Sequence, residues 1–180
     1  DLFIATTHRG YDGSYRVMGM EKCRKSLLSY AYRVNEQYIV QVWDRESIII
    51  ADSGAFTAFS RGEPIRPEEY LDWAISLRHR WAAHVRRLEF MSLDVIGDQE
   101  ASWRNYFFLK TQGLDCIPIV TYGVDLSHIT KALNLSRRIA LGGLVPLALH
   151  RTKLQAWLDA CFAVVGEWSR KNHNQMPHVH

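Results

Sequence analysis

Short apolar runs that end in a polar residue or a glycine alternate with longer amphipathic stretches along this chain. The clearest run covers residues 48–51, which have no polar alternation and lead directly into Asp52. A strand of this composition is typically buried on both faces, as in a parallel sheet. Parallel strands need long crossover connections, usually helices, so the pattern predicts an α/β fold. We expect strands at 2–7, 48–51, 89–95, 116–120 and 138–144, and helices at 68–86, 99–111, 126–135 and 152–170.

Other stretches have weaker patterns. Residues 22–32 fit either a helix or a short strand that ends near Ser29, and both alternatives stay open. Residues 38–43 alternate weakly, and residues 61–65 have the composition of a loop. Residues 178–180 are expected to begin a further strand.

Candidate ligand-binding residues follow four successive predicted strands. They are Asp52, Asp94, Tyr122-Gly123 and Gly142-Gly143. A doubly wound sheet concentrates such residues near one switch point, whereas a (β/α)8 barrel of the TIM type draws them from many strand ends. The distribution favours the barrel. Because a complete barrel takes about 250 residues, we expect residues 1–180 to form a single domain, an incomplete barrel that lacks its C-terminal strands.

Composition narrows the class of protein. No apolar run approaches the roughly 20 residues that a membrane span needs, so we expect no membrane partner. The three cysteines are far apart, which indicates reduced thiols in a cytoplasmic protein. The histidines at 173–180 fit no standard zinc spacing, and no Gly-x-Gly-x-x-Gly or P-loop occurs. We therefore expect no metal and no nucleotide cofactor.

Asp52 and Asp94 are the strongest candidates for chemistry. Two carboxyl groups in one low-dielectric pocket separate their pKa values, so that one can hold a proton while the other stays charged. Carboxylates also accept hydrogen bonds from the N–H edge of a purine-like base. The alternative for either residue is a structural role as the cap of the following helix.

Small and aromatic residues accompany the two acids. Gly54 and the pair Gly142-Gly143 would let a flat ligand approach the backbone. Tyr122-Gly123 and Phe56 are candidate stacking surfaces, with core packing as the alternative for Phe56.

Basic side chains crowd into residues 78–87, with Trp81 among them. Such a cluster is typical of a surface that faces phosphates, and its candidate nucleic-acid-binding residues are Arg78, Arg80, Arg86 and Arg87. The alternative is a solvated helix face with salt bridges. Phosphate contacts would make binding weaken steeply with salt.

Two motifs resemble those of a known enzyme family. The segment Asp52-Ser53-Gly54-Ala55-Phe56 resembles the Asp-Ser-Gly-Gly-Phe motif of the tRNA-guanine transglycosylase superfamily, and residues 141–144 resemble its Leu-Gly-Gly-Leu motif. Asp94 falls between them, as a base-recognising aspartate does in that family. Residues 28–32 and 52–57 look closer to the phage and bacterial branch that modifies DNA with 7-deazaguanines. The resemblance spans about residues 27–145.

The resemblance implies a glycosyltransferase that exchanges bases in nucleic acid. In the family, a carboxylate attacks C1′ of guanosine and displaces guanine, and a 7-deazaguanine (preQ0-like, related to queuosine) then takes its place. By resemblance Asp52 would be the catalytic acid and base, and DNA is preferred over tRNA as the partner. The base-binding residues would be Ser53, Asp94, Tyr122, Gly123, Gly142, Gly143 and Leu144.

Two parts of the family's machinery have no counterpart before His180. They are the nucleophilic aspartate of a later strand and the Cys-x-Cys-x-x-Cys plus His zinc site, and Asp159 lies in a helical pattern that suits a nucleophile poorly. We expect residues beyond this chain to supply both, zinc included. The alternatives are a non-catalytic nucleic-acid-binding relative and an unrelated barrel glycoside hydrolase that uses Asp52 and Asp94.

Overall fold

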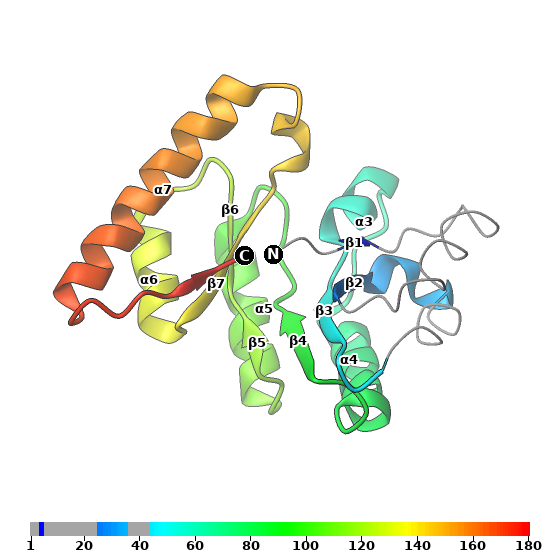
Figure 1. Ribbon diagram of the computed structural model, residues 1–180. Coiled ribbons are helices and arrows are strands. Elements are labelled where there is room, and N and C mark those ends of the chain that lie inside the picture. The colour runs from blue at the N-terminus through cyan, green and yellow to red at the C-terminus, as the bar shows by residue number, and fades with distance from the viewer. Residues whose placement is uncertain (1–3, 6–24, 36–43) are drawn as a thin grey trace.

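The computed structural model describes residues 4–5, 25–35 and 44–180. In these ranges strands and helices alternate, which confirms the predicted mixed α/β chain (Figure 1). The strands are β1 (Ile4–Ala5), β2 (Lys25–Ser29), β3 (Ile48–Asp52), β4 (Arg87–Met91), β5 (Cys116–Ile117), β6 (Ile119–Thr121), β7 (Arg138–Gly142) and β8 (His178–Val179). The helices are α3 (Ala55–Arg61), α4 (Pro67–Trp81), α5 (Gln99–Thr111), α6 (Ser127–Leu135) and α7 (Arg151–Lys171), with 3-10 turns η1 (Tyr30–Asn35) and η3 (Val145–Leu147).

All of the described strand pairs are parallel, and strands that are neighbours in space are neighbours in sequence. The order is β1-β2-β3-β4-β5 in one sheet and β6-β7-β8 in the other. Pro118 separates β5 from β6, and its carbonyl oxygen accepts a hydrogen bond of 2.9 Å from the backbone N–H of Ala140. Within the described ranges the strand order never reverses, so they contain no switch point of the doubly wound kind. A complete eight-stranded barrel is not shown.

Strand β3 is buried on both faces, as its composition predicts. Ile49 and Ala51 belong to the main core, which they share with Tyr70 and Leu77 of α4. Ile50 points the other way and belongs to a second, smaller cluster with residues of β4, β5, β6 and β7. The main core thus joins helices to the sheet, and the second cluster lies on the sheet's concave side.

Several element boundaries differ from those predicted. Helix α4 ends at Trp81 rather than near residue 86, and strand β4 ends at Met91 rather than 95. Helix α3 was not predicted, because it has only seven residues and follows Gly54, which has a φ of 72° and no capping side chain. The ambiguous stretch 22–32 contains strand β2 and the start of η1. The weak pattern at 38–43 lies outside the described residues.

Side chains replace part of the backbone ladder beside β6. After Met91 the chain leaves strand β4, and Gln99 at the start of α5 takes over its pairing role. The Gln99 amide nitrogen donates to Ile119 O at 2.9 Å, and its oxygen accepts from Thr121 N at 3.0 Å. Ser92 Oγ accepts from Ile119 N at 3.3 Å. These contacts satisfy the open edge of β6, so residues 93–95 are free to turn away toward the strand ends.

The substitution Gln99→Leu tests this role. It removes the partners of a buried N–H and a buried carbonyl, each of which costs about 1–3 kcal/mol when left unpaired. We expect a loss of at least that size in the free energy of unfolding, measured by urea denaturation. The exposed Gln112→Leu serves as the control. Equal stability of the two variants would contradict the role of Gln99.

Candidate functional site

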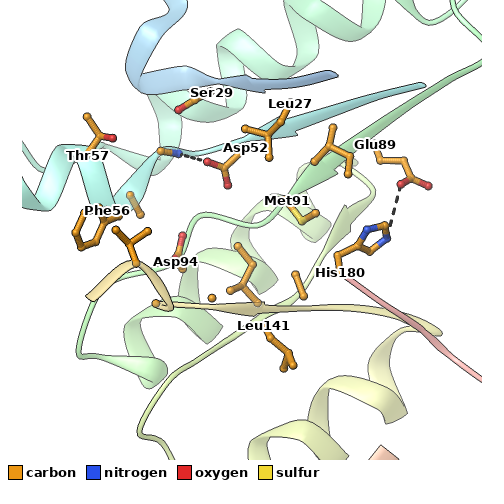
Figure 2. Close-up of a pocket in the computed structure, with 18 of the residues that line it drawn as sticks. Leu27, Ser29, Asp52, Phe56, Thr57, Glu89, Met91, Asp94, Leu141 and His180 are labelled. Carbon is orange, nitrogen blue, oxygen red and sulfur yellow. Dashed lines mark hydrogen bonds and ion pairs between the residues drawn. The ribbon is translucent and has the colours of Figure 1, made fainter. Parts of the chain in front are cut away.

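The concave side of the sheet encloses a cavity of about 800 Å³ (Figure 2). Its lining comes from alternate residues of strands β2, β3 and β4, from residues of β6, β7 and β8, and from α3. Asp52 and Asp94 lie at the end where the strands terminate, and Glu89 and His180 lie at the opposite end. Apolar side chains such as Met91 separate the two polar ends.

Asp52 is the last residue of β3, and its carboxyl group faces the cavity. Its Oδ2 atom accepts a hydrogen bond of 2.8 Å from the backbone N–H of Gly54. Burial raises the pKa of Asp52 above its ordinary value, and hydrogen bonds from the Gly54 and Ser53 backbone oppose this shift. The carboxyl group is therefore held in a fixed orientation and takes up a proton more readily than an exposed aspartate.

Asp94 reaches the same end of the cavity from the segment after β4. Burial, and then the nearby charge of Asp52, raise the pKa of Asp94 to about 6. Ser53 Oγ donates to Asp94 Oδ1 at 3.1 Å and accepts from Ala55 N at 3.2 Å. Ser53 is fully buried and does not line the cavity, so its contribution is to orient Asp94.

The two carboxyl groups can act as a proton-sharing pair. Asp94 is buried and Asp52 is half-buried, and the charge of Asp52 contributes to the raised pKa of Asp94. Between its two pKa values, a pair of this kind holds one proton and one negative charge. Such a state can donate a proton to one ligand atom and accept a hydrogen bond from another, which matches the mixed edge of a heterocyclic base.

The glycine pair lines the cavity beside Asp94. Gly142 and Gly143 both line the cavity, whereas Leu144 does not and Val145 takes its place. A Cβ atom at Gly142 would lie 2.7 Å from Ile119 Cγ2 and 3.7 Å from Asp94 Oδ2. The missing side chain therefore keeps the space beside the Asp94 carboxyl group open.

Of the predicted aromatic contacts, one lines the cavity and one lies outside it. Tyr122 and Gly123 do not line the cavity, and the Tyr122 ring packs edge-on against Trp157 with 5.4 Å between the ring centroids. Phe56 does line it, from the first turn of α3. The structure thus brings together Asp52, Asp94 and the glycine pair but leaves Tyr122-Gly123 outside.

The predicted basic cluster lies at the opposite end of the strands from the two acids, and of its four arginines only Arg87 lines the cavity. Arg87 begins β4, and the other three arginines precede it, so all four are at the amino ends of the parallel strands. Arg78 donates to Gly113 O at 2.9 Å, and Arg80 donates to Ser76 O at 3.3 Å. Arg87 lies 3.7 Å from Glu89. Part of the cluster therefore serves local contacts, as the alternative to phosphate binding predicts.

Several cavity residues were not singled out in the sequence. Ser29 is paired in register with Asp52, and its buried hydroxyl has no hydrogen-bond partner among the described residues. Glu89 is 5% exposed, forms ion pairs with Arg87 and Arg138, and lies 3.9 Å from His180 Nε2. Glu89 could have been found in the sequence, because it is a charged residue within an otherwise buried strand. Ser29 belongs to the segment 28–32 that carries part of the family resemblance, but its place beside Asp52 follows from strand register, which no local pattern gives.

The described residues contain no cluster of three or more His, Cys, Asp or Glu side chains placed to hold a metal ion. Cys116 and Cys161 are buried free thiols, and burial raises the pKa of Cys116 to about 12. None of the described helices combines the length and apolar character that crossing a bilayer requires. No family model, curated protein or solved structure matches this chain.

The pKa of Asp94 predicts how stability depends on pH. The folded state holds this proton more tightly than the unfolded chain, so the stabilisation is present at low pH and is lost as pH rises from about 4 to 6. The slope reaches about 1.4 kcal/mol per pH unit. Asp94→Asn removes this titration, so its stability relative to wild type should rise across the window in urea denaturation. The exposed Asp72→Asn is the control, and a constant difference for Asp94→Asn would contradict the assignment.

Proposed function

We propose that this protein exchanges bases in nucleic acid, replacing guanine with a 7-deazaguanine by a transglycosylase mechanism, with DNA preferred over tRNA. The observation that carries the proposal is the convergence of Asp52, Asp94 and the Gly142-Gly143 pair on one cavity. These residues are separated by up to 91 positions in sequence (143 − 52). The motifs that resemble the guanine transglycosylases therefore meet in space as a base-binding site requires.

The proposed fold is the larger part of a (β/α)8 barrel. If β5 and β6 count as one strand interrupted at Pro118, the eight labelled strands occupy seven positions, all parallel and in chain order. This sequential order supports a barrel, since a barrel is wound in one direction. The proposed site lies at the carboxyl ends of the strands, where barrel enzymes bind their ligands.

The two acids have different roles in the proposal. Asp94, held by Ser53, binds the pyrimidine edge of the base, and Asp52 transfers protons to and from the leaving and entering bases. Backbone groups of Gly142 and Gly143 contact the entering base. The nucleophile for C1′ is not assigned to a described residue, because Asp159 is exposed and accepts a hydrogen bond from Gln155 on α7.

Base recognition is tested by binding of free 7-deazaguanine in isothermal titration calorimetry. A hydrogen bond to a charged group contributes about 1.5–3 kcal/mol, so Asp94→Asn should weaken binding at least about tenfold. Asp72→Asn, which lies on α4 away from the cavity, should bind like wild type. Equal affinity of both variants would remove Asp94 from the base site.

Exchange is tested with DNA that carries radiolabelled guanine. Wild type should release the label when 7-deazaguanine is added, and Asp52→Asn should abolish release while circular dichroism shows an unchanged fold. Release at the wild-type rate would exclude Asp52 from proton transfer. Binding of 7-deazaguanine by wild type without any release would instead favour the second candidate function, a base-binding protein without chemistry, which the unassigned nucleophile supports.

A further inference from the structure

We propose that the rim of the cavity mouth is the surface that docks DNA, in place of the basic cluster at the other end of the strands. The rim consists of α3 and of the connection from β7 into α7, and its outward residues are Phe59, Arg61, Val145, Leu149, Arg151 and Lys153. This inference rests on the proposed function, because it locates the polymer whose base enters the cavity. Figure 1 shows both segments at the same end of the molecule, away from the loop that follows α4.

Large apolar side chains are exposed on both parts of the rim. Phe59 is 63% exposed, Val145 59% and Leu149 92%. Phe59 lies three residues after Phe56 on α3, so the two share a helix face that leads from the cavity to the outside. Val145 lines the cavity on the other side, and Leu149 lies beyond it. The apolar surface is thus continuous with the cavity wall, unlike isolated apolar residues on an ordinary surface.

Basic side chains flank these apolar residues. Arg151 and Lys153 are exposed in the first turn of α7, which contains no acidic residue. Arg61 is exposed at the end of α3, with its guanidinium 5.3 Å from the centroid of the Tyr32 ring. Exposed acidic residues also occur at this end: Asp98 caps α5 and lies 3.9 Å from Arg104, Asp125 accepts from Ser127 N, and Glu63 follows α3.

This combination fits a nucleic acid better than an anionic membrane surface. A base that enters the cavity must leave its stack, at a cost of a few kcal/mol. Proteins that open a stack commonly insert an apolar side chain at the vacated step and hold the neighbouring phosphates with basic residues. Leu149 can serve as that apolar wedge, and Arg151 and Lys153 can hold the phosphates. A membrane would use the apolar residues but would leave the adjacent polar cavity without a function.

The charge contribution is tested with a fluorescent DNA duplex that contains one mismatched guanine. Removing two phosphate contacts should lower the slope of log affinity against log salt by about 1.8 and weaken binding about tenfold or more at low salt. We expect this for Arg151→Ala/Lys153→Ala. The matched control, Arg80→Ala/Arg86→Ala, removes the same charge at the other end and should keep the wild-type slope. An equal slope change in both variants, or a larger one in the control, would overturn the proposal.

The apolar contribution is tested with Leu149→Ala. This variant should weaken binding to the mismatched duplex several-fold more than binding to the same strand without its complement, since only the duplex needs a wedge. Phe162→Ala, on an exposed part of α7, is the control and should affect neither. Equal effects of Leu149→Ala on both DNA forms would overturn the wedge role.

Two further measurements separate this proposal from the proposed function. Calorimetry with free 7-deazaguanine should give the wild-type affinity in Arg151→Ala/Lys153→Ala, because neither residue lines the cavity. If wild type binds no free base, the proposed function fails; if it binds the base but the rim variants keep wild-type DNA binding, only the docking surface fails. The proposal would also be overturned if Arg151→Ala/Lys153→Ala lost binding to anionic lipid vesicles while its binding to DNA stayed unchanged.

Discussion

The side-chain amide of Gln99 determines where the chain turns away from the sheet. Because Gln99 and Ser92 pair with β6 in place of a backbone strand, β4 ends at Met91 without leaving the buried groups of β6 unpaired. The segment that follows can then carry Asp94 into the cavity instead of continuing the ladder. The meeting of the two acids therefore depends on a polar side chain that lies outside the cavity.

The cavity mouth contains carboxyl groups, whose charged form a protein interior disfavours. Two neighbouring carboxyl groups lie there, one buried and one half-buried, and burial opposes their ionisation. Hydrogen bonds from Gly54 N and Ser53 Oγ offset part of that cost and hold the groups in place. At the opposite end of the cavity, the negative charge of the buried Glu89 is compensated by Arg87 and Arg138.

Local patterns predicted the parallel α/β chain and the bounds of α5, and they selected Asp52, Asp94 and the glycine pair as candidates. They did so because apolar periodicity and strand ends are properties of neighbouring residues. Helix α3 escaped prediction because it is short and uncapped, and β4 was placed too late because Gln99 acts from outside the strand. The position of Arg78–Arg87 relative to the acids follows from the direction of the strands. The position of Ser29 beside Asp52 follows from the register of β2 and β3, which depends on residues far apart in the sequence.

Gly54 restricts how this site can diversify. A Cβ atom at this position would lie 2.3 Å from Ser29 Oγ and 2.6 Å from Ala31 Cβ, and the backbone φ of 72° already disfavours other residues. The segment that follows β3 can therefore lie against Ser29 and Ala31 only because no side chain intervenes at position 54. A mutagenesis library aimed at new base specificity would recover variants at the positions around the mouth, while position 54 would stay invariant.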